Sequence, residues 1–535
     1  MAQDGIVDLM GEKIREISIS EFFEKNRHLL GYENPTKSLL TVVKEMVDNS
    51  IDAALEAGIL PTIKVSVKSD SENVFRIRVE DNGPGLPPDK IPFAFGKFLV
   101  GSKFYRLRQS VGTQGIGAKG AILYAQLTTG KPAIISTFYK GKRYDIEMTI
   151  DVLKNEPKVI STNFKNIDGN KHGLIMDLTV EGRYIEKGQS IPTYLRYIWL
   201  ANPFIEIIYE DPNKNVIKLE RLTNELPPLP KEIKPHPYGV ELGRFKRMLQ
   251  LSTGKTVLSF LTKEFSRVGK NNAIKACKLA RISIDKKCEE LSEKEIEKLY
   301  RALQSLKLKA PPTDCLSPLK NEFIEQSLKK EFDAEFVVAV TRKPSVYRGN
   351  PFQVQAAIAY GGNLINTIGN ENPSILIRFA NHTPLLYNQH DCVITRAVEE
   401  IDWRNYKISQ QKGFPVAPMV IFVDLISVWI PYKSEGKQAI AEYPEILKEI
   451  KLALQEAGRK LGLYLSKKIR LQEARQRRGI FEAYSKVFSE YLSNIVNKDE
   501  KIIFEKVIKL IEEGKYKEVE EKKEETKEIV EEIKV

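Results

Sequence analysis

Residues 44–54 read KEMVDNSIDAA, and their spacing decides how the amino-terminal third of the chain folds. Glu45 and Asn49 stand four positions apart, so on a helix both side chains project from one face, about 6 Å apart at Cβ. A carboxylate there can orient or deprotonate a water, and an amide oxygen can coordinate a hard cation such as Mg²⁺. The apolar periodicity around them predicts a helix over Ser38–Ala57 that presents both groups to one ligand.

A second segment, DNGPG at residues 81–85, follows a strand-like stretch. Ile63–Val67 and Val74–Val79 alternate at period two, which predicts two antiparallel strands, the second leading to Asp81. An ionised Asp81 accepts hydrogen bonds only, so it suits the exocyclic amine of adenine. The glycines of the segment let a ligand approach the backbone closely.

A third segment, GTQGIGAKG at residues 112–120, enters the apolar run Ala121–Leu127. Successive backbone N–H groups before a helix can hold phosphates, and Lys119 adds positive charge. It is not a Walker A loop, which needs adjacent Gly and Lys, because Ala118 separates Gly117 from Lys119.

The three segments occur in this order within residues 45–120, and together they resemble the GHKL superfamily of gyrase, Hsp90, MutL and histidine kinases, the Bergerat fold. The resemblance implies an α+β sandwich that binds ATP and Mg²⁺ under a mobile lid. It implies that Glu45 is the general base, Asn49 the Mg²⁺ ligand and Asp81 the reader of adenine. By the same resemblance the lid residues that bind the nucleotide are Gly112, Thr113, Gln114, Gly115, Ile116, Gly117, Ala118 and Lys119, with Ser102 and Lys103 before them.

One position departs from the superfamily pattern. A Gly-Thr pair usually supports the adenine-reading aspartate, whereas this chain has Gly173-Leu174. Leucine has no side-chain hydroxyl, so a water or Thr179 remains open as its replacement.

The rest of the chain divides at a proline-rich stretch. Five prolines between Asn224 and Gly239 predict a linker. Gly239–Ser305 has a helical pattern rich in Lys and Arg, and strand-like runs return afterwards. From about Tyr443 into the 480s the pattern is that of a long helix, and a Glu/Lys-rich tail begins at about Glu512. The later strands are predicted at Phe336–Val340, Gln353–Ala359, Ile375–Phe379 and Val420–Leu425, the last inside the apolar, buried stretch Ala417–Ile430.

These later segments carry a more specific resemblance. RKPSVYRGNPFQVQAAIAYGG (342–362), ILIRFANHTPLLY (375–387) and IPYKSEGKQAIA (430–441) resemble the transducer domain of the B subunits of archaeal-type DNA topoisomerase VI, the type IIB family. The helical stretch resembles that family's helix-two-turns-helix insertion. A MutL-like mismatch-repair ATPase and an Hsp90-like protein clamp are the alternative functions.

The family resemblance implies a domain plan. The fold class is α+β: a GHKL sandwich, a helical insertion, an α+β transducer of ribosomal S5-like fold and a long C-terminal helix. The expected limits are 1–20 for an N-terminal strap, 21–228 for the ATPase domain, 229–306 for the helix-two-turns-helix domain, 307–470 for the transducer, and 471–535 for a helical extension and tail.

The resemblance also implies a function for Lys437. In the family a switch lysine reaches from the transducer to the γ-phosphate, and Lys437 in SEGKQAI matches it. One ammonium can report whether that phosphate is present. Lys433, four residues away, is the competing candidate.

DNA cleavage is expected to reside on another chain. The sequence has 21 tyrosines, none marked by its context, and no DxD motif. The resemblance implies an A subunit that breaks the duplex, a heterotetramer of two A and two B chains, and B–B dimerisation on ATP binding. ATP would then drive the passage of one duplex through another, which relaxes supercoils and decatenates DNA. Candidate contacts with double-stranded DNA are Arg244, Lys246 and Arg247; Lys270, Lys275 and Lys278; and Lys467, Lys468, Arg470, Arg475, Arg477 and Arg478.

Bulk composition agrees with these expectations. A net charge of +12 suits a polyanionic partner. No apolar run reaches the roughly 20 residues of a membrane span, and the amino terminus lacks a signal peptide, so a cytoplasmic protein is expected. The four cysteines form no CxxC pair, which argues against a zinc site or a disulfide framework.

Overall fold

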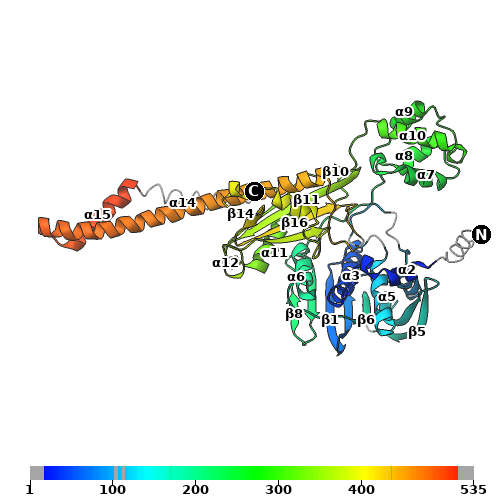
Figure 1. Ribbon diagram of the computed structural model, residues 1–535, viewed down its shortest axis with the longest axis horizontal. Coiled ribbons are helices and arrows are strands. Elements are labelled where there is room, and N and C mark those ends of the chain that lie inside the picture. The colour runs from blue at the N-terminus through cyan, green and yellow to red at the C-terminus, as the bar shows by residue number, and fades with distance from the viewer. Residues whose placement is uncertain are drawn as a thin grey trace, which may run out of the picture.

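The computed structural model describes residues 17–101, 106–110, 112, 115–167, 169, 171–434 and 436–515. Two sheets with helices packed on them form the centre of the molecule. A small helical lobe stands apart from both sheets, and one long helix projects from the second (Figure 1). The predicted α+β class is confirmed.

An eight-stranded mixed sheet underlies the amino-terminal part, in the order β5-β4-β3-β6-β2-β1-β7-β8. β1 and β2 pair antiparallel with Ile63 opposite Asp81, so the two strands predicted there are confirmed. The pairing leaves Asp81 at the end of a central strand. The strands are β1 Thr62–Ser71, β2 Val74–Asp81, β3 Ala133–Tyr139, β4 Lys142–Asp151, β5 Glu156–Asn166, β6 Leu174–Glu181, β7 Glu206–Glu210 and β8 Val216–Leu219.

Helix α3, Pro35–Glu56, crosses this sheet and starts one turn before the predicted Ser38. The predicted start is wrong because Asn34 caps the helix: its Oδ1 accepts the Lys37 N–H at 2.9 Å. Pro35 occupies the first helical position, where its missing N–H has no intrahelical partner to lose. The other helices of this part are α2 Ile19–Lys25, η1 Arg27–Leu30, η2 Pro88–Lys90, α4 Ile91–Gly96, α5 Gly117–Thr129 and α6 Ile191–Ala201.

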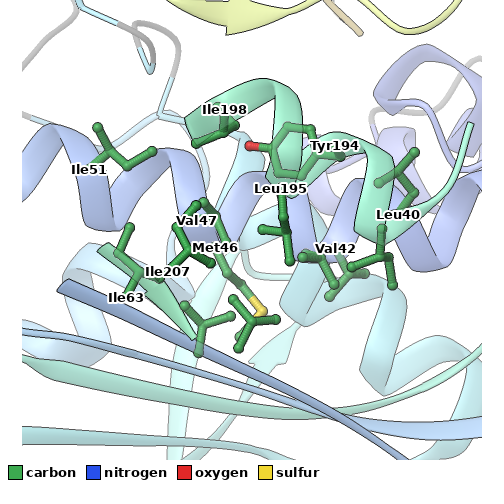
Figure 2. Packing of buried hydrophobic residues seen from close by; sticks show 14 of the residues in the cluster. Leu40, Val42, Met46, Val47, Ile51, Ile63, Tyr194, Leu195, Ile198 and Ile207 are labelled. Carbon is green, nitrogen blue, oxygen red and sulfur yellow. The ribbon is translucent and has the colours of Figure 1, made fainter. Parts of the chain in front are cut away.

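Apolar side chains hold α3 between the sheet and α6 (Figure 2). Val42, Met46 and Val47 of α3 are buried, and they meet Leu195 of α6 and Ile207 of β7 in one cluster. Each such side chain contributes about 1.5–3 kcal/mol when it is fully buried. The opposite face of α3, with Glu45 and Asn49, is thereby fixed in position.

The proline-rich stretch leads to the helical lobe. Residues 220–236, all of them described, contain no helix or strand, as the predicted linker requires. The lobe has its own core, in which the rings of Phe245 and Phe260 meet edge to face at 5.6 Å. Its elements are η3 Pro237–Gly239, α7 Leu242–Gln250, α8 Val257–Glu264, α9 Lys270–Ala280, η4 Cys288–Glu290 and α10 Glu293–Ser305.

A six-stranded sheet follows, in the order β10-β11-β16-β12-β13 with β9 on β11. The four strands predicted here are confirmed, and every residue of β16 is buried, including Asp424. The elements are α11 Asn321–Phe332, β9 Phe336–Thr341, β10 Ser345–Tyr347, β11 Asn350–Tyr360, α12 Leu364–Thr367, β12 Ile375–Ala380, β13 Thr383–Pro384, α13 Val393–Glu399, η5 Trp403–Tyr406, β14 Ser409–Gln411, β15 Phe414–Val416 and β16 Met419–Ser427.

The predicted long helix, α14 Pro444–Val496, extends beyond the 480s. Its first half packs on the six-stranded sheet through buried residues as far as Leu465, and its second half projects from the molecule (Figure 1). Asn497 ends it in the left-handed conformation, and α15, Glu500–Lys515, packs back against it.

Some predictions concern residues outside this description. Most of the expected strap (residues 1–16) and of the tail (516–535) lie outside the described residues. The proposed domain limits remain predictions. The four cysteines are buried. Within the described part of the chain, no helix is both long and apolar enough to cross a membrane.

Candidate nucleotide-binding site

The polar face of α3 brings together the first predicted site residues. The Glu45 side chain is 22% exposed. Asn49 Nδ2 donates to the Glu45 carbonyl at 2.6 Å, so its Oδ1 is the atom left to meet a ligand. Asp52, one turn further on, accepts the Gly112 N–H at 2.9 Å. Glu45, Asn49 and Asp52 therefore line one continuous edge of the helix.

The glycine-rich segment lies directly against this edge. A Cβ added to Gly117 would overlap the Glu45 carboxylate, and one added to Gly112 would lie 3.4 Å from Asn49 Oδ1. Gly117 begins α5, so the helix amino terminus points toward Glu45. Close approach therefore explains the glycine at position 117, whereas a Cβ at position 112 would make only ordinary van der Waals contacts.

Asp81 is buried at the end of β2 with three hydrogen-bond donors around it. Ser50 Oγ donates to Asp81 Oδ2 at 2.9 Å, and the N–H groups of Gly83 and Leu174 donate to Oδ1 at 2.9 and 3.2 Å. Burial raises the pKa of the Asp81 carboxyl, and these donors oppose that rise. The carboxylate is fixed in orientation before any ligand arrives.

The departure at Gly173-Leu174 is resolved by these contacts. Gly173 has φ +121, and a Cβ there would overlap the Asp81 carbonyl oxygen, so this glycine is required. Leu174 contributes its backbone N–H, which any residue except proline has. Thr179 was wrong as the replacement, because it pairs with Arg76 further along β2.

Ser50 is the residue that sequence reasoning missed. It follows Asn49 directly, about 100° further round the helix, on the side that faces the end of β2. Asking which residue of α3 faces Asp81 would have found it.

Lys119 contacts the backbone of the lid segment. Its Nζ donates to the carbonyls of Val100 and Gly115, the latter at 2.8 Å. Burial lowers the pKa of Lys119 to about 8. The ammonium thus joins backbone carbonyls before and within the lid segment, and its contact with a phosphate stays a prediction. Four further predicted residues, Ser102, Lys103, Thr113 and Gln114, lie outside the described residues.

Lys437 lies in the loop that follows β16 of the second sheet, and it comes near the site. Burial lowers the pKa of Lys437, and the nearby Glu45 carboxylate opposes that shift, with Asp52 also close enough to act on it. Lys433 instead lies 3.9 Å from Asp391 with 44% of its side chain exposed. Lys437 thus stands within the electrostatic influence of α3, and the choice of Lys437 over Lys433 as the switch lysine stays a prediction.

A buried ion pair beside Glu45 was also not predicted. Lys44 Nζ lies 2.9 Å from Asp48 Oδ2, and Tyr194 donates to Asp48 Oδ1 at 2.5 Å. Burial would lower the pKa of Lys44, but Asp48 and Glu45 raise it overall. Lys44 also lies 3.5 Å from Glu45 Oε1, so Glu45 faces a permanent positive charge.

Two family models match the chain. The model described as histidine kinase-, DNA gyrase B-, and HSP90-like ATPase matches residues 34–153, which contain the site on α3, Asp81 and the glycine-rich segment. The model described as topoisomerase VI B subunit, transducer, matches residues 311–477, which contain Lys437.

Known proteins that are named as the B subunit of type 2 DNA topoisomerase 6 align with most of the chain. The protein of Archaeoglobus fulgidus is 45% identical over 470 residues, which are 86% of this chain and 76% of the relative. That of Metallosphaera sedula is 38% identical over 502 residues, 93% of each chain. The chain belongs to the family of type 2 DNA topoisomerase 6 B subunits. As a member of this family it is the ATP-hydrolysing subunit of an ATP-dependent topoisomerase, and the MutL-like and Hsp90-like alternatives are set aside.

Proposed function

We propose that ATP binds along α3, with its adenine at Asp81 and its phosphates at residues 112–119. One observation carries this proposal: Gly117, at the amino terminus of α5, lies directly against the Glu45 carboxylate at one end of the polar face of α3. Lys437 supports it, because Glu45 is near enough to oppose the lowering of the pKa of Lys437 by burial. A γ-phosphate at that end meets a base, a helix amino terminus and an ammonium.

Asn49 fits the Mg²⁺ that normally accompanies ATP. Its amide nitrogen is engaged by the helix backbone, which presents Oδ1 for coordination. When bound, Mg²⁺ would offset the charge of the phosphates. Asn49 would hold it together with phosphate oxygens.

Glu45 is the proposed general base for hydrolysis. Its carboxylate accepts a proton from a water while the water oxygen bonds to the γ-phosphorus and the bond from the γ-phosphorus to the bridging oxygen of ADP breaks. Lys44 lies 3.5 Å from Glu45, which orients the carboxylate by attraction. Lys437 would bind the γ-phosphate itself and release it after hydrolysis.

The far half of α14 is the proposed surface for the A subunit, which would carry the DNA-cleaving tyrosine. Phe481, Tyr484, Phe488 and Tyr491 are spaced three and four residues apart, so they share one face of the helix. Their exposed fractions are 53, 71, 55 and 68%. Large aromatic side chains exposed in a row are typical of an interface.

Two B chains are proposed to dimerise through their ATPase domains when ATP binds, with residues 1–20 as the strap and two A chains completing the heterotetramer. ATP is then a ligand that closes a clamp, and it acts only as far as it binds the closed dimer better than the open chain.

DNA is the proposed polyanionic partner. The basic clusters on α7, α9 and α14 would contact phosphates without reading sequence, so binding should weaken steeply with salt. Lys246, Lys468, Arg477 and Arg478 are already paired with Glu293, Glu335, Glu473 and Glu482, so DNA phosphates would compete with these carboxylates.

Purification of the full chain with its A subunit tests the proposal. We expect the complex to relax supercoiled plasmid only with ATP and Mg²⁺, and double-stranded DNA to stimulate ATP hydrolysis less as salt increases. Relaxation that is independent of ATP, or hydrolysis that DNA does not change, would contradict it.

A further inference from the structure

A short segment just before the glycine-rich segment contacts the linker, α3 and the loop before α11. At its start, the Ile233 N–H donates to the Leu107 carbonyl at 2.9 Å, which ties it to the linker. At its end, the Gly112 N–H donates to Asp52 on α3. Residues 106–110 and 112, called here the lid root, therefore stand between the nucleotide site and the rest of the molecule.

Gln109 joins the lid root to the loop before α11. Its Oε1 accepts the Ser317 N–H at 2.7 Å and its Nε2 donates to the Ser317 carbonyl at 3.3 Å. Gln109 is 6% exposed, and an amide that pairs with both backbone groups of one residue fixes distance and orientation together.

Asn381 makes the second connection. Its Nδ2 donates to the Ser110 carbonyl at 3.1 Å and to the Ser427 carbonyl at 3.0 Å, and its Oδ1 accepts the Ser427 N–H at 2.9 Å. Ser427 ends β16, so one side chain links the lid root to the central strand of the second sheet.

The buried side chain of His382 connects the same loop to β16. His382 Nδ1 lies 2.6 Å from Asp424 Oδ2, and Nε2 lies 2.9 Å from the same Ser317 carbonyl that Gln109 contacts. Asn202, the residue that caps the carboxyl end of α6, donates to the His382 carbonyl at 3.0 Å. The contacts thus form one connected network through the interface between the two sheets.

We propose that Gln109 and Asn381 are positioning residues that set the lid root, and through Gly112 the phosphate end of the site, according to the position of the second sheet. Asn381 contacts Ser110, and Gly112, two residues further along the chain, contacts Asp52. Asp52 lies one helical turn from Asn49. A shift of β16 would therefore displace Ser110 and Gly112, and with them the turn of α3 that contains Asn49 and Asp52. The connection is separate from the proposed contact of Lys437 with the γ-phosphate, and it rests on the proposed binding of ATP along α3.

Steady-state ATP hydrolysis by the full chain with its A subunit tests this inference. Gln109→Leu removes both hydrogen bonds to Ser317 at similar size. We expect the KM for ATP to rise roughly fivefold to tenfold, while kcat changes less than about twofold, because the base on Glu45 is untouched. Loss of folded protein alone would lower kcat and leave KM unchanged.

Gln355→Leu is the matched control. Gln355 clamps Leu319 in the same way, accepting its N–H at 2.9 Å and donating to its carbonyl at 2.8 Å, but from within the second sheet. We expect a comparable loss of thermal stability with KM unchanged. An equal rise of KM in Gln355→Leu would overturn the inference.

Asn381→Ala provides a second route should Gln109→Leu not fold. It should raise KM in the same direction, and the double variant should raise KM by less than the product of the single effects, because both side chains hold one segment. A KM that is unchanged in the folded variants would overturn the inference. Absence of ATP hydrolysis by the wild-type complex would instead contradict the proposed function.

Discussion

At the scale of single residues, Glu45 is defined by the charges around it. Lys44, 3.5 Å away, precedes Glu45 on α3 and is paired with Asp48, whereas Lys437 comes from the loop between β16 and α14. The carboxylate therefore keeps one fixed cation and gains or loses another as the sheets move. That arrangement connects the proposed chemistry with the position of the second sheet.

Glu45→Gln keeps the size of the side chain and removes its ability to take a proton. We expect ATP turnover to fall by about 10²–10⁴-fold while ATP still binds, because the amide preserves the contacts of the helix face. Turnover is measured by phosphate release and binding by fluorescent nucleotide titration. Glu72→Gln in the exposed turn between β1 and β2 is the control, and turnover of Glu45→Gln close to wild type would remove Glu45 as the base.

Ser50→Ala tests the support of Asp81. Without the hydroxyl at 2.9 Å, the buried carboxylate loses one of its three donors, so we expect ATP affinity to fall roughly fivefold to tenfold with kcat nearly unchanged. Isothermal titration measures the affinity. Ser66→Ala is the control, since Ser66 Oγ donates to Glu210 at 3.1 Å on an outer strand of the same sheet. Equal affinities for both variants would show that Ser50 does not support adenine recognition.

His382 predicts a dependence of stability on pH. Both ring nitrogens face acceptors, Asp424 and the Ser317 carbonyl, so the protonated ring satisfies both. Burial would lower the pKa of His382, but the Asp424 carboxylate raises it overall. Its stabilising contribution is therefore complete below the unfolded pKa of about 6.5 and is lost as pH rises through the folded-state pKa.

His382→Asn should accordingly cost more free energy of unfolding at pH 6 than at pH 9. Urea unfolding at the two pH values measures the difference between variant and wild type. The exposed His390 serves as control, and its replacement by Asn should leave the pH dependence of wild type intact. A cost of His382→Asn that is the same at both pH values would contradict a protonated ring.

At the scale of elements, the sequence was most informative where one face is buried. The alternation in β1 and β2 predicted both strands and their pairing, and the apolar run Ala417–Ile430 predicted the buried strand β16. The start of α3 was missed because it depends on the cap at Asn34, which lies before the apolar pattern begins. α15 had no predicted limits because its Lys and Glu residues repeat without a clear stop signal.

Gly117→Ala tests how closely α5 must approach α3. Alanine favours a helix over glycine by roughly 0.5–1 kcal/mol, so α5 itself should not weaken. The added Cβ overlaps the Glu45 carboxylate, which must move, and we expect kcat for ATP to fall by roughly 10²-fold. Gly243→Ala in α7, where a Cβ has nothing within 4 Å, is the control and should leave kcat unchanged. A Gly117→Ala variant with wild-type kcat would show that the proposed approach to Glu45 is not needed.

At the scale of the whole molecule, the site is shared between two sheets. The spacing of Glu45, Asn49 and the glycines could be predicted, because one helix and one loop fix it. The junction of Gln109 with Ser317 could not be predicted, because it joins residues far apart in sequence and neither belongs to a motif. Lys437 could be named from family resemblance alone, since nothing in its own surroundings in the sequence distinguishes it from Lys433.

Lys437 and Lys433 provide the test at this scale. Lys437 is half-buried and near enough to Glu45 and Asp52 of α3 for their carboxylates to act on its pKa, whereas Lys433 pairs with Asp391 at the surface. Lys437→Met keeps the length and apolar part of the side chain and removes the charge that would bind the γ-phosphate. Without that contact, ATP gives little preference to the closed arrangement of the two sheets, since a ligand shifts an equilibrium only by its differential affinity.

We therefore expect Lys437→Met to lower the ratio of supercoil relaxation to ATP hydrolysed by the reconstituted complex roughly tenfold. Relaxation is followed by gel electrophoresis and ATP by phosphate release in the same reaction. Lys433→Met should keep the wild-type ratio, because an exposed pair such as Lys433–Asp391 contributes little. If Lys433→Met lowers the ratio and Lys437→Met does not, the two assignments are reversed. If neither variant changes it, the second sheet responds to the nucleotide through the lid root instead.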